Sequence, residues 1–149
     1  MLVRDVMTHA VRLVRPNETI EQAASTMAEI DAGLLPVTDD DRMIGMITDR
    51  DIAVRAVARG LGPDTKVSEV MTTDVKYCFD DEAAEDVAEN MGDIQVRRLP
   101  VLDRDKRLVG IVSLGDIATT HESPAVAHAL SGISEPGGQH SQTGSQVFA

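Results

Sequence analysis

Apolar and polar positions follow the same succession twice along the chain, which predicts two copies of one folding unit. Each copy opens with a short apolar–polar alternation, typical of a strand, and continues with apolar residues at helical spacing. Two apolar runs separated by an Asp- and Arg-rich turn then predict a pair of strands, and a second helical pattern closes the copy. These segments are residues 11–13, 20–30, 34–37, 43–48 and 51–59 in the first copy, and 75–77, 87–94, 99–102, 108–113 and the stretch from 116 in the second.

Matching residues support a duplication. The stretch Val3–Thr8 (VRDVMT) matches Val67–Thr72 (VSEVMT), and later in each copy a Pro-Val pair stands at Pro36 and Pro100. A three-stranded sheet with one half-buried face is marginal alone, so two copies are expected to share a core. The predicted fold is therefore of the α/β (α+β) class, with two β-α-β-β-α repeats packed sheet to sheet around a pseudo-two-fold axis.

Helix ends are marked in the first copy and less clearly in the second. Thr19 followed by Gln22 has the spacing of a capping box. The second copy carries Ala83 at the position of Thr19, so we expect Asp80 or Asp81 to begin that helix instead.

The C-terminal part predicts one more helix, over residues 125–130, with Pro124 in its first turn. After it the chain becomes rich in Gly, Ser and Gln without periodicity, which predicts a flexible tail. The expected organisation is repeat 1 over 1–62, repeat 2 over 63–121, a helical extension over 122–134 and the tail over 135–149.

The chemistry with most promise is a hydroxyl residue three positions before an aspartate, found at the end of each copy. The stretch Gly45–Asp51 reads GMITDRD, and Gly110–Asp116 reads GIVSLGD. At a strand-to-helix turn the hydroxyl suits a phosphate and the carboxylate suits the two hydroxyls of a ribose. The plainer interpretation is that Asp51 and Asp116 only cap helices.

The net charge and the distribution of apolar residues limit the kinds of partner that the chain is expected to have. A net charge of −11 argues against nucleic acid, which requires Lys and Arg to neutralise phosphates. No stretch has the length of an apolar membrane span, and the first residues lack the form of a signal peptide. We therefore expect neither a nucleic-acid nor a membrane partner, and a cytoplasmic location.

Catalysis and metal binding find no support in the sequence. The single cysteine, Cys78, alternates with Tyr77 and Phe79 and is expected to be a small buried residue. Ser113 has no histidine base at an interpretable position. No metal-ligand spacing relates the four histidines, which are His9, His121, His128 and His140. The expectation is a protein that is not an enzyme, with no catalytic residues, no metal and no obligatory cofactor.

The repeated Val-x-x-Val-Met-Thr start, the Leu-Pro-Val strand and the Gly-x-x-(Thr/Ser)-x-x-Asp end resemble the CBS domain. Over about residues 1–120 the chain resembles a tandem CBS pair, or Bateman module, and is similar to stand-alone bacterial CBS-pair proteins, including the hypoxic response protein type. The resemblance implies a non-catalytic regulatory module that binds an adenosine-containing ligand (AMP, ADP, ATP, NAD or S-adenosylmethionine) in the cleft between the repeats. It also implies a homodimer, which could act through a further protein partner.

The resemblance assigns roles to residues of this chain. Thr48 and Ser113 are expected to contact phosphate, and Asp51 and Asp116 the ribose hydroxyls. Residues near Val11 and Val75 are expected to line the base. Those expected to flank the adenine are Leu35, Pro36, Leu99 and Pro100.

The two copies are chemically unequal. Arg97 and Arg98 stand where the first copy has Gly33-Leu34, and they suit either phosphate recognition or an exposed strand end. Asp49 opposes a nearby phosphate unless it points away, and its counterpart is Leu114. We therefore expect unequal occupancy, with the Ser113–Asp116 site favoured. The alternative function is a structural or partner-binding dimer whose nucleotide sites are vestigial.

Overall fold

The computed structural model describes residues 1–120 and 124–135, and the chain divides into two compact units. Unit 1 comprises Met1–His9, Tyr77–Asp103 and Val109–Ala149, and unit 2 comprises Ala10–Lys76 and Arg104–Leu108. Each unit combines helices with a sheet, which confirms the predicted α+β class. The first residues of each sequence repeat lie in the unit formed mainly by the other repeat: residues 1–9 belong to unit 1, and residues 67–76 belong to unit 2. These two stretches are called the exchanged segments below, and the order of segments along the chain does not reveal their exchange.

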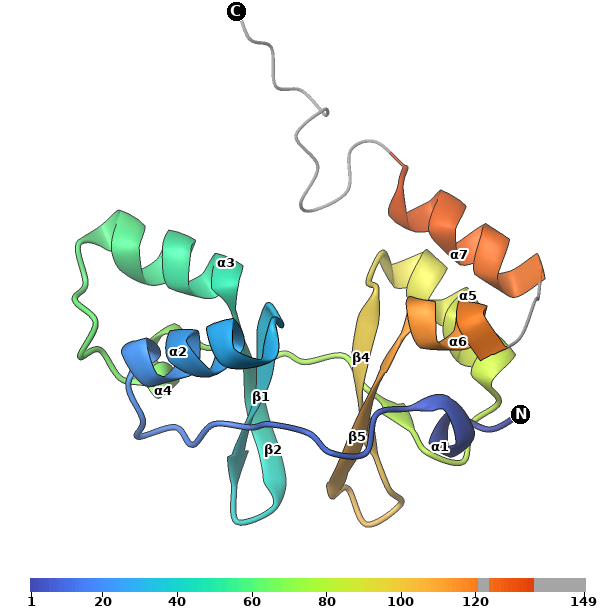
Figure 1. Cartoon of the computed structure of the whole chain (residues 1–149), viewed down its shortest axis with the longest axis horizontal. Helices are drawn as coiled ribbons and strands as arrows, with labels where there is room; N and C mark the ends of the chain where they lie inside the picture. The colour runs from blue at the N-terminus through green and yellow to red at the C-terminus, as the bar shows by residue number, and fades with distance from the viewer. Residues whose placement is uncertain (121–123, 136–149) are drawn as a thin grey trace, which may run out of the picture. The chain divides into compact units, whose positions relative to one another are not determined.

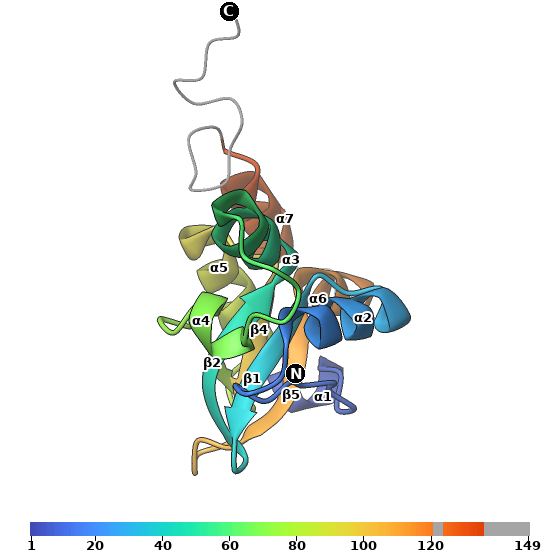
Figure 2. The same cartoon turned by 90° about the vertical axis from the view of Figure 1, so that its left-hand side faces the viewer.

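Unit 2 is built on a two-stranded antiparallel sheet in which Leu35 lies opposite Ile47. These strands, β1 and β2, lie side by side in both Figure 1 and Figure 2. The closing helix after β2 is irregular: one α-helical turn continues as a π-helix and ends as a 3-10 helix. The elements are α2 (Ile20–Ile30), β1 (Leu34–Asp39), β2 (Arg42–Thr48), α3 (Asp49–Asp51), η1 (Ile52–Ala56), η2 (Val57–Arg59) and α4 (Val67–Val70).

Unit 1 has a three-stranded sheet in the order β3-β4-β5, with β3 parallel to β4. Two helices, α5 and α7, pack closely against each other beside it (Figure 1). The elements are α1 (Val3–Val6), β3 (Cys78–Phe79), α5 (Ala84–Ile94), β4 (Arg98–Leu102), β5 (Leu108–Ser113), α6 (Leu114–Thr120) and α7 (Pro124–Ile133). The helix expected after Pro124 is confirmed, whereas the tail expected over 135–149 lies, beyond residue 135, outside the described residues.

The first strand of each repeat lies later than the alternation predicts. In unit 2 it is a single parallel bridge between Val14 and Val37, and in unit 1 it is β3, which begins at Cys78. Val14 and Cys78 are buried, whereas Leu13 and Tyr77 are exposed. The predictions at 11–13 and 75–77 are therefore wrong, because the residue that contacts the core comes one position after each alternating stretch.

The start of α2 is the predicted capping box, since the Thr19 hydroxyl accepts the Gln22 N–H at 3.2 Å. The start of α5 differs from expectation, because Ala83 is the N-cap and no side chain caps the helix. Instead, the N–H of Ala84 donates to the carbonyl of Met1 at 2.9 Å. The exchanged N-terminal segment thus satisfies the first backbone donor of α5, and the prediction of Asp80 or Asp81 as the cap is wrong.

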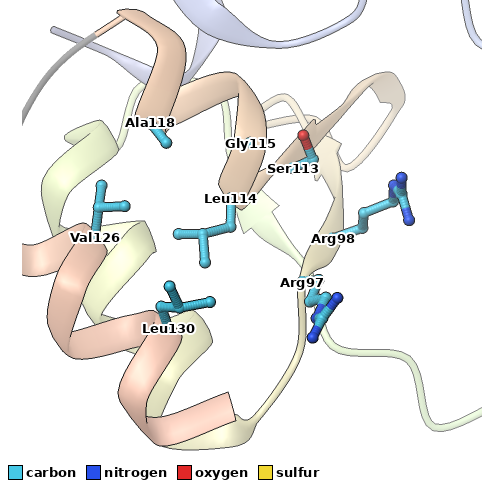
Figure 3. A pocket seen from close by; sticks show the side chains of 8 residues that line it. All are labelled: Arg97, Arg98, Ser113, Leu114, Gly115, Ala118, Val126 and Leu130. Carbon is cyan, nitrogen blue, oxygen red and sulfur yellow. The ribbon is translucent and has the colours of Figure 1, made fainter. Parts of the chain in front are cut away.

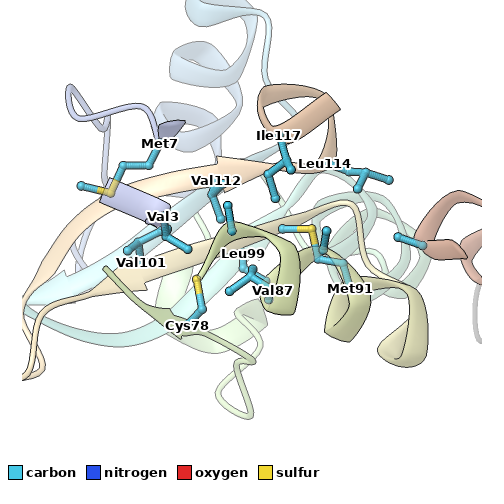
Figure 4. Packing of buried hydrophobic residues seen from close by; sticks show 13 residues of the cluster. Val3, Met7, Cys78, Val87, Met91, Leu99, Val101, Val112, Leu114 and Ile117 are labelled. Atoms are coloured by element: carbon cyan, nitrogen blue, oxygen red, sulfur yellow. The ribbon is translucent and has the colours of Figure 1, made fainter. Parts of the chain in front are cut away.

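Each unit has its own aliphatic core, as the near absence of aromatic residues requires. In unit 1 the side chains of Val3, Met91, Leu99 and Ile117 meet between the sheet and helices α1, α5 and α6 (Figure 4). Within the described residues, no helix has the length and apolar character needed to cross a membrane.

The glycine that opens each Gly-x-x-(Thr/Ser)-x-x-Asp motif marks a close backbone approach. Thr8 exchanges two hydrogen bonds with Ile111, of 2.8 and 3.0 Å, so the exchanged segment crosses β5 beside Gly110. A Cβ atom at Gly110 would lie 2.8 Å from the Thr8 carbonyl oxygen and 2.6 Å from the Met7 sulfur. Gly45 meets Thr72 and Met71 in the same way in unit 2.

We predict that Gly110→Ala lowers the free energy of unfolding by about 2 kcal/mol, because the new methyl group must displace backbone. Gly115→Ala is the matched control: its Cβ would meet only the Ser113 hydroxyl, at 3.6 Å, in ordinary contact. In a helix this change is expected to be neutral or to stabilise by up to about 1 kcal/mol. Urea unfolding measures both variants, and equal effects would contradict the close approach at Gly110.

Candidate functional site

Each closing helix begins with a reciprocal pair of hydrogen bonds between the hydroxyl residue and the aspartate. The Thr48 hydroxyl accepts the Asp51 N–H at 3.0 Å, while the Asp51 carboxylate accepts the Thr48 N–H at 3.0 Å. Ser113 and Asp116 form the same pair at 3.0 and 2.9 Å. The hydroxyl residue is thus the N-cap and the aspartate the third helical residue, so the interpretation of Asp51 and Asp116 as the caps themselves is wrong.

In both units the capping box leaves hydrogen-bonding groups of its two side chains without a partner inside the box. Each hydroxyl accepts one bond and keeps its own proton to donate, and each carboxylate engages one oxygen in the box. A structural role and a ligand-binding role are therefore compatible in the same residues. Whether a box can also bind a ligand depends on the other groups that contact its aspartate.

In unit 2 the carboxylate of Asp51 is occupied by its neighbours. The Thr72 hydroxyl lies 3.3 Å from both of its oxygens, and Nη1 of Arg55 lies 4.0 Å from Oδ1. The same Arg55 nitrogen donates to the carbonyls of Val70 and Met71, which fixes the exchanged segment beside the box. Only 12% of the Asp51 side chain is exposed, so a ligand would have to displace these bonds.

In unit 1 the carboxylate of Asp116 remains open. Thr8 pairs with β5 as Thr72 pairs with β2, yet its hydroxyl makes no hydrogen bond to Asp116. Within residues 1–120 and 124–135, the Asp116 carboxylate accepts only the Ser113 N–H. Its second oxygen is therefore available for a hydroxyl donor such as a ribose.

The two units also carry opposite charges at the entrance to the closing helix. The N–H of Asp49 donates to the Gly33 carbonyl at 2.9 Å, and in unit 1 the N–H of Leu114 donates to the Arg97 carbonyl at 2.8 Å. A Cβ atom at Gly33 would lie 2.8 Å from an Asp49 carboxylate oxygen, so this carboxylate lies against Gly33. Where unit 2 presents a carboxylate, unit 1 presents an arginine.

Arg97 and Arg98 are exposed, and neither guanidinium has an ion-pair partner within the part of the chain that the structure describes. Together with Ser113 they border a cavity of about 350 Å³ in unit 1 (Figure 3). The remaining lining comes from α6 and α7 and is mostly apolar: Leu114, Gly115, Ala118, Val126 and Leu130.

The expected site residues lie in different places: some border this cavity, some belong to the two cores, and some lie in neither. Ser113, Arg97 and Arg98 meet at the cavity, and Asp116 is hydrogen-bonded to Ser113 without lining it. Leu35 and Leu99 are 0% and 1% exposed and belong to the two cores, and Pro36 and Pro100 are also buried. Val11 and Val75 are half-buried in segments without strand pairing.

The adenine and base roles of these six residues remain predictions. Two further sets of residues contribute to these sites and were not predicted from the sequence. Thr72 reaches Asp51 only through the exchange of segments, although its position beside Met71 in the repeated start was a usable signal. Val126 and Leu130 line the cavity because α7 packs beside it, and no sequence motif predicts this packing.

No metal cluster is formed by the described part of the chain, in which no three His, Cys, Asp or Glu side chains converge to hold an ion. Of the histidines, His128 lies 3.6 Å from an Asp93 carboxylate oxygen, and His121 and His140 lie outside the described residues. The expectation of no metal remains a prediction.

These features belong to a known class of protein. The profile of the CBS domain matches residues 3–57 and 67–121, and the chain belongs to the CBS domain family, with two CBS domains in tandem. It is 44% identical over 133 residues to the CBS domain-containing protein YhcV of Bacillus subtilis, covering 89% of this chain and 94% of that protein. It is 40% identical over 135 residues to hypoxic response protein 1 of Mycobacterium tuberculosis, with the same coverage.

Solved structures agree with this assignment. The crystal structure of Hypoxic Response Protein I, which has two coordinated zinc ions, is 40% identical, with a TM-score of 0.74 over 82% of this chain and 100% of that chain. Two others hold adenosine ligands, and each covers 80% of this chain and 94% of the other. They are the CBS domain pair of MJ0100 with 5-methylthioadenosine and S-adenosyl-L-methionine (30% identical, TM-score 0.70) and CBSX2 with AMP (26% identical, TM-score 0.70).

Cys78 lies in β3 and is buried, as expected. Burial, and secondarily the negative charge of Glu82, raises the pKa of the Cys78 thiol from 9.0 to about 12. Because the thiolate is the reactive form, this environment opposes oxidation and nucleophilic chemistry.

We predict that iodoacetamide at pH 8 labels Cys78 far more slowly in the folded protein than in urea. Because the raised pKa belongs to the folded state, its stabilising contribution is complete below pH 9 and is lost as the pH rises towards about 12. Mass spectrometry measures the labelling, and alkaline unfolding curves measure the stability. Equal labelling rates in the two states would contradict the buried, protonated thiol.

Proposed function

We propose that the chain is a regulatory module that binds an adenosine-containing nucleotide, with the principal site in unit 1. The observation that carries this proposal is the difference between the two capping boxes. Asp116 has an open carboxylate oxygen, and its partner Ser113 lines a cavity with Arg97 and Arg98, whereas Asp51 is hydrogen-bonded to Thr72. The adenosine ligands in the structures of MJ0100 and CBSX2 support the ligand class.

In the proposed mode of binding, the open oxygen of Asp116 accepts the ribose hydroxyls. The Ser113 hydroxyl, which already accepts the Asp116 N–H, donates its proton to the phosphate. Arg97 and Arg98 supply the positive charge that an anionic ligand needs in a chain of net charge −11. The proposed module is not an enzyme: in this mode of binding Asp116, Ser113 and the two arginines hold the ligand, and none of them is assigned a chemical step.

Thermal unfolding with AMP, ADP, ATP, NAD and S-adenosylmethionine tests the proposal directly. A ligand at 100 times its dissociation constant stabilises the folded state by about 2.7 kcal/mol. Absence of any shift at millimolar concentrations would refute the nucleotide module and favour the alternative, a structural or partner-binding dimer with vestigial sites.

Variants then test the residue roles. Arg97→Ala is expected to weaken AMP binding about tenfold, because hydrogen bonds to charged groups contribute about 1.5–3 kcal/mol each. Asp116→Asn is expected to reduce the preference for AMP over its 2′-deoxy analogue. Asp51→Asn is the matched control and should leave both affinities unchanged, since that carboxylate is already bonded to Thr72. Titration calorimetry measures all three, and an effect of Asp51→Asn equal to that of Asp116→Asn would reverse the assignment.

We also propose a cytoplasmic homodimer, which could present its ligand state to a partner protein. Val54 and Val57 support self-association, because they are 47% and 65% exposed and lie three positions apart on the closing helix of unit 2. A two-fold interface uses the same patch on both copies, so exposed apolar side chains there would be covered twice.

Sedimentation is expected to give a dimer mass for the wild-type chain and a monomer mass for Val57→Asp, because the charge would be desolvated in the interface. Leu13→Asp is the control: Leu13 is a comparably exposed apolar residue outside that helix, and its replacement should leave the dimer intact. A monomeric wild type, or a dimeric Val57→Asp, would contradict this interface.

A further inference from the structure

Part of the wall of the unit 1 cavity comes from outside the CBS domain. The second domain match ends at residue 121, whereas α7 begins at Pro124 and contributes Val126 and Leu130 to the lining. In Figure 3 the side chains of Leu114, Val126 and Leu130 point toward one another across the cavity. The CBS domain match therefore accounts for the polar side of this cavity and for the residues of α6, but not for Val126 and Leu130 of α7.

Helix α7 is held firmly enough to act as a wall. A Cβ atom at Gly92 of α5 would lie 2.6 Å from the Cα of Ala129, and one at Gly132 would lie 2.6 Å from the Gly92 carbonyl oxygen. The two helices thus touch along their backbones, and Ala129 is fully buried. The Gln95 side-chain amide adds a hydrogen bond to the Gly132 carbonyl at 3.0 Å.

The cavity is divided by polarity. Ser113, Arg97 and Arg98 form one side and suit phosphate, whereas the side chains of α6 and α7 form the other and offer no charge. Leu130 is 53% exposed although it lines a concave surface, so apolar area there remains uncovered. Covering such area with a ligand group is favourable, at about 25 cal/mol per Å².

The hydrogen bond between Asp116 and Ser113 connects the capping box with the cavity. Asp116 is hydrogen-bonded to Ser113, and Ser113 lines the same cavity as the arginines and the apolar side chains of α6 and α7. A nucleotide whose ribose lies at Asp116 and whose phosphates lie at Ser113 would have room for whatever follows its phosphates in a cavity that α7 helps to line.

We propose that α7 forms a specificity subsite for a neutral ring or other largely apolar group attached beyond the phosphates of an adenosine nucleotide. This proposal rests on the nucleotide function proposed above. It names the ligand class as an adenosine diphosphate esterified to such a group rather than a simple mono-, di- or triphosphate. A cavity of about 350 Å³ is of the size that small-molecule sites have.

Three ligands that differ stepwise test the subsite: ADP, ADP-ribose and NADH. NADH adds an uncharged dihydronicotinamide ring to ADP-ribose, so the comparison isolates the group expected at α7. Titration calorimetry on the full chain is expected to give about tenfold tighter binding of NADH than of ADP-ribose. Leu130→Ser should remove most of this difference and leave the affinity for ADP unchanged.

Val126→Ser is the second variant, and Leu13→Ser is the matched control because Leu13 is an exposed leucine of unit 2. Thermal unfolding without ligand checks that each variant is folded. If ADP binds but NADH binds no more tightly than ADP-ribose, or if both α7 variants keep the difference, the subsite is refuted and the nucleotide function stands. If none of these three ligands binds the wild-type chain, the subsite is refuted, and thermal unfolding with AMP, ATP and S-adenosylmethionine then decides whether the nucleotide function fails as well.

Discussion

The pairing of each exchanged segment with the last strand of a repeat is the constraint on which the rest of the structure depends. Thr8 pairs with Ile111 and Thr72 with Met46, through backbone bonds of 2.8 to 3.0 Å. The pairing requires a residue without a side chain at Gly110 and Gly45, since a Cβ atom at either would meet the crossing backbone at 2.8 Å. The glycine of the motif is therefore fixed by packing, before any ligand is considered.

The same pairing determines what each aspartate can do. It carries the Thr72 hydroxyl to the carboxylate of Asp51, whereas the Thr8 hydroxyl makes no corresponding bond to Asp116. The sequence motif is equivalent in the two repeats, and so is the capping box. What differs is the occupancy of the second carboxylate oxygen, which is a property of the tertiary contacts and not of the motif.

The sequence predicted local structure correctly where neighbouring residues alone determine it. The capping box of α2 and the bounds of β5 came out as predicted, because a Thr-x-x-Gln pattern and a bounded apolar run each have a local cause. The strand at Cys78 and the start of α5 were predicted wrongly, because both depend on distant partners: Val101 for the strand and the Met1 carbonyl for the helix.

For the candidate site, the sequence was sufficient to indicate the hydroxyl–aspartate pairs and the unequal copies. It could not indicate that Thr72 occupies Asp51 or that α7 borders a cavity. Both contacts join residues that are far apart in the chain, and neither leaves a period or a motif. The contribution of Leu130 depends on backbone contact at Gly92 and Gly132, whose spacing carries no signal by itself.

Electrostatics gives an independent reason for the inequality of the two units. The net charge of −11 repels any nucleotide at long range, but salt screens this field over about 8 Å at physiological ionic strength. Charges within that distance of a bound phosphate would therefore decide which of the two boxes the proposed ligand prefers. Unit 2 places the Asp49 carboxylate against Gly33, and unit 1 places Arg97 at the equivalent position. An anion that could use either capping box thus meets repulsion at one and attraction at the other, in agreement with the hydrogen bonds of the described residues, which occupy Asp51 and leave an oxygen of Asp116 open.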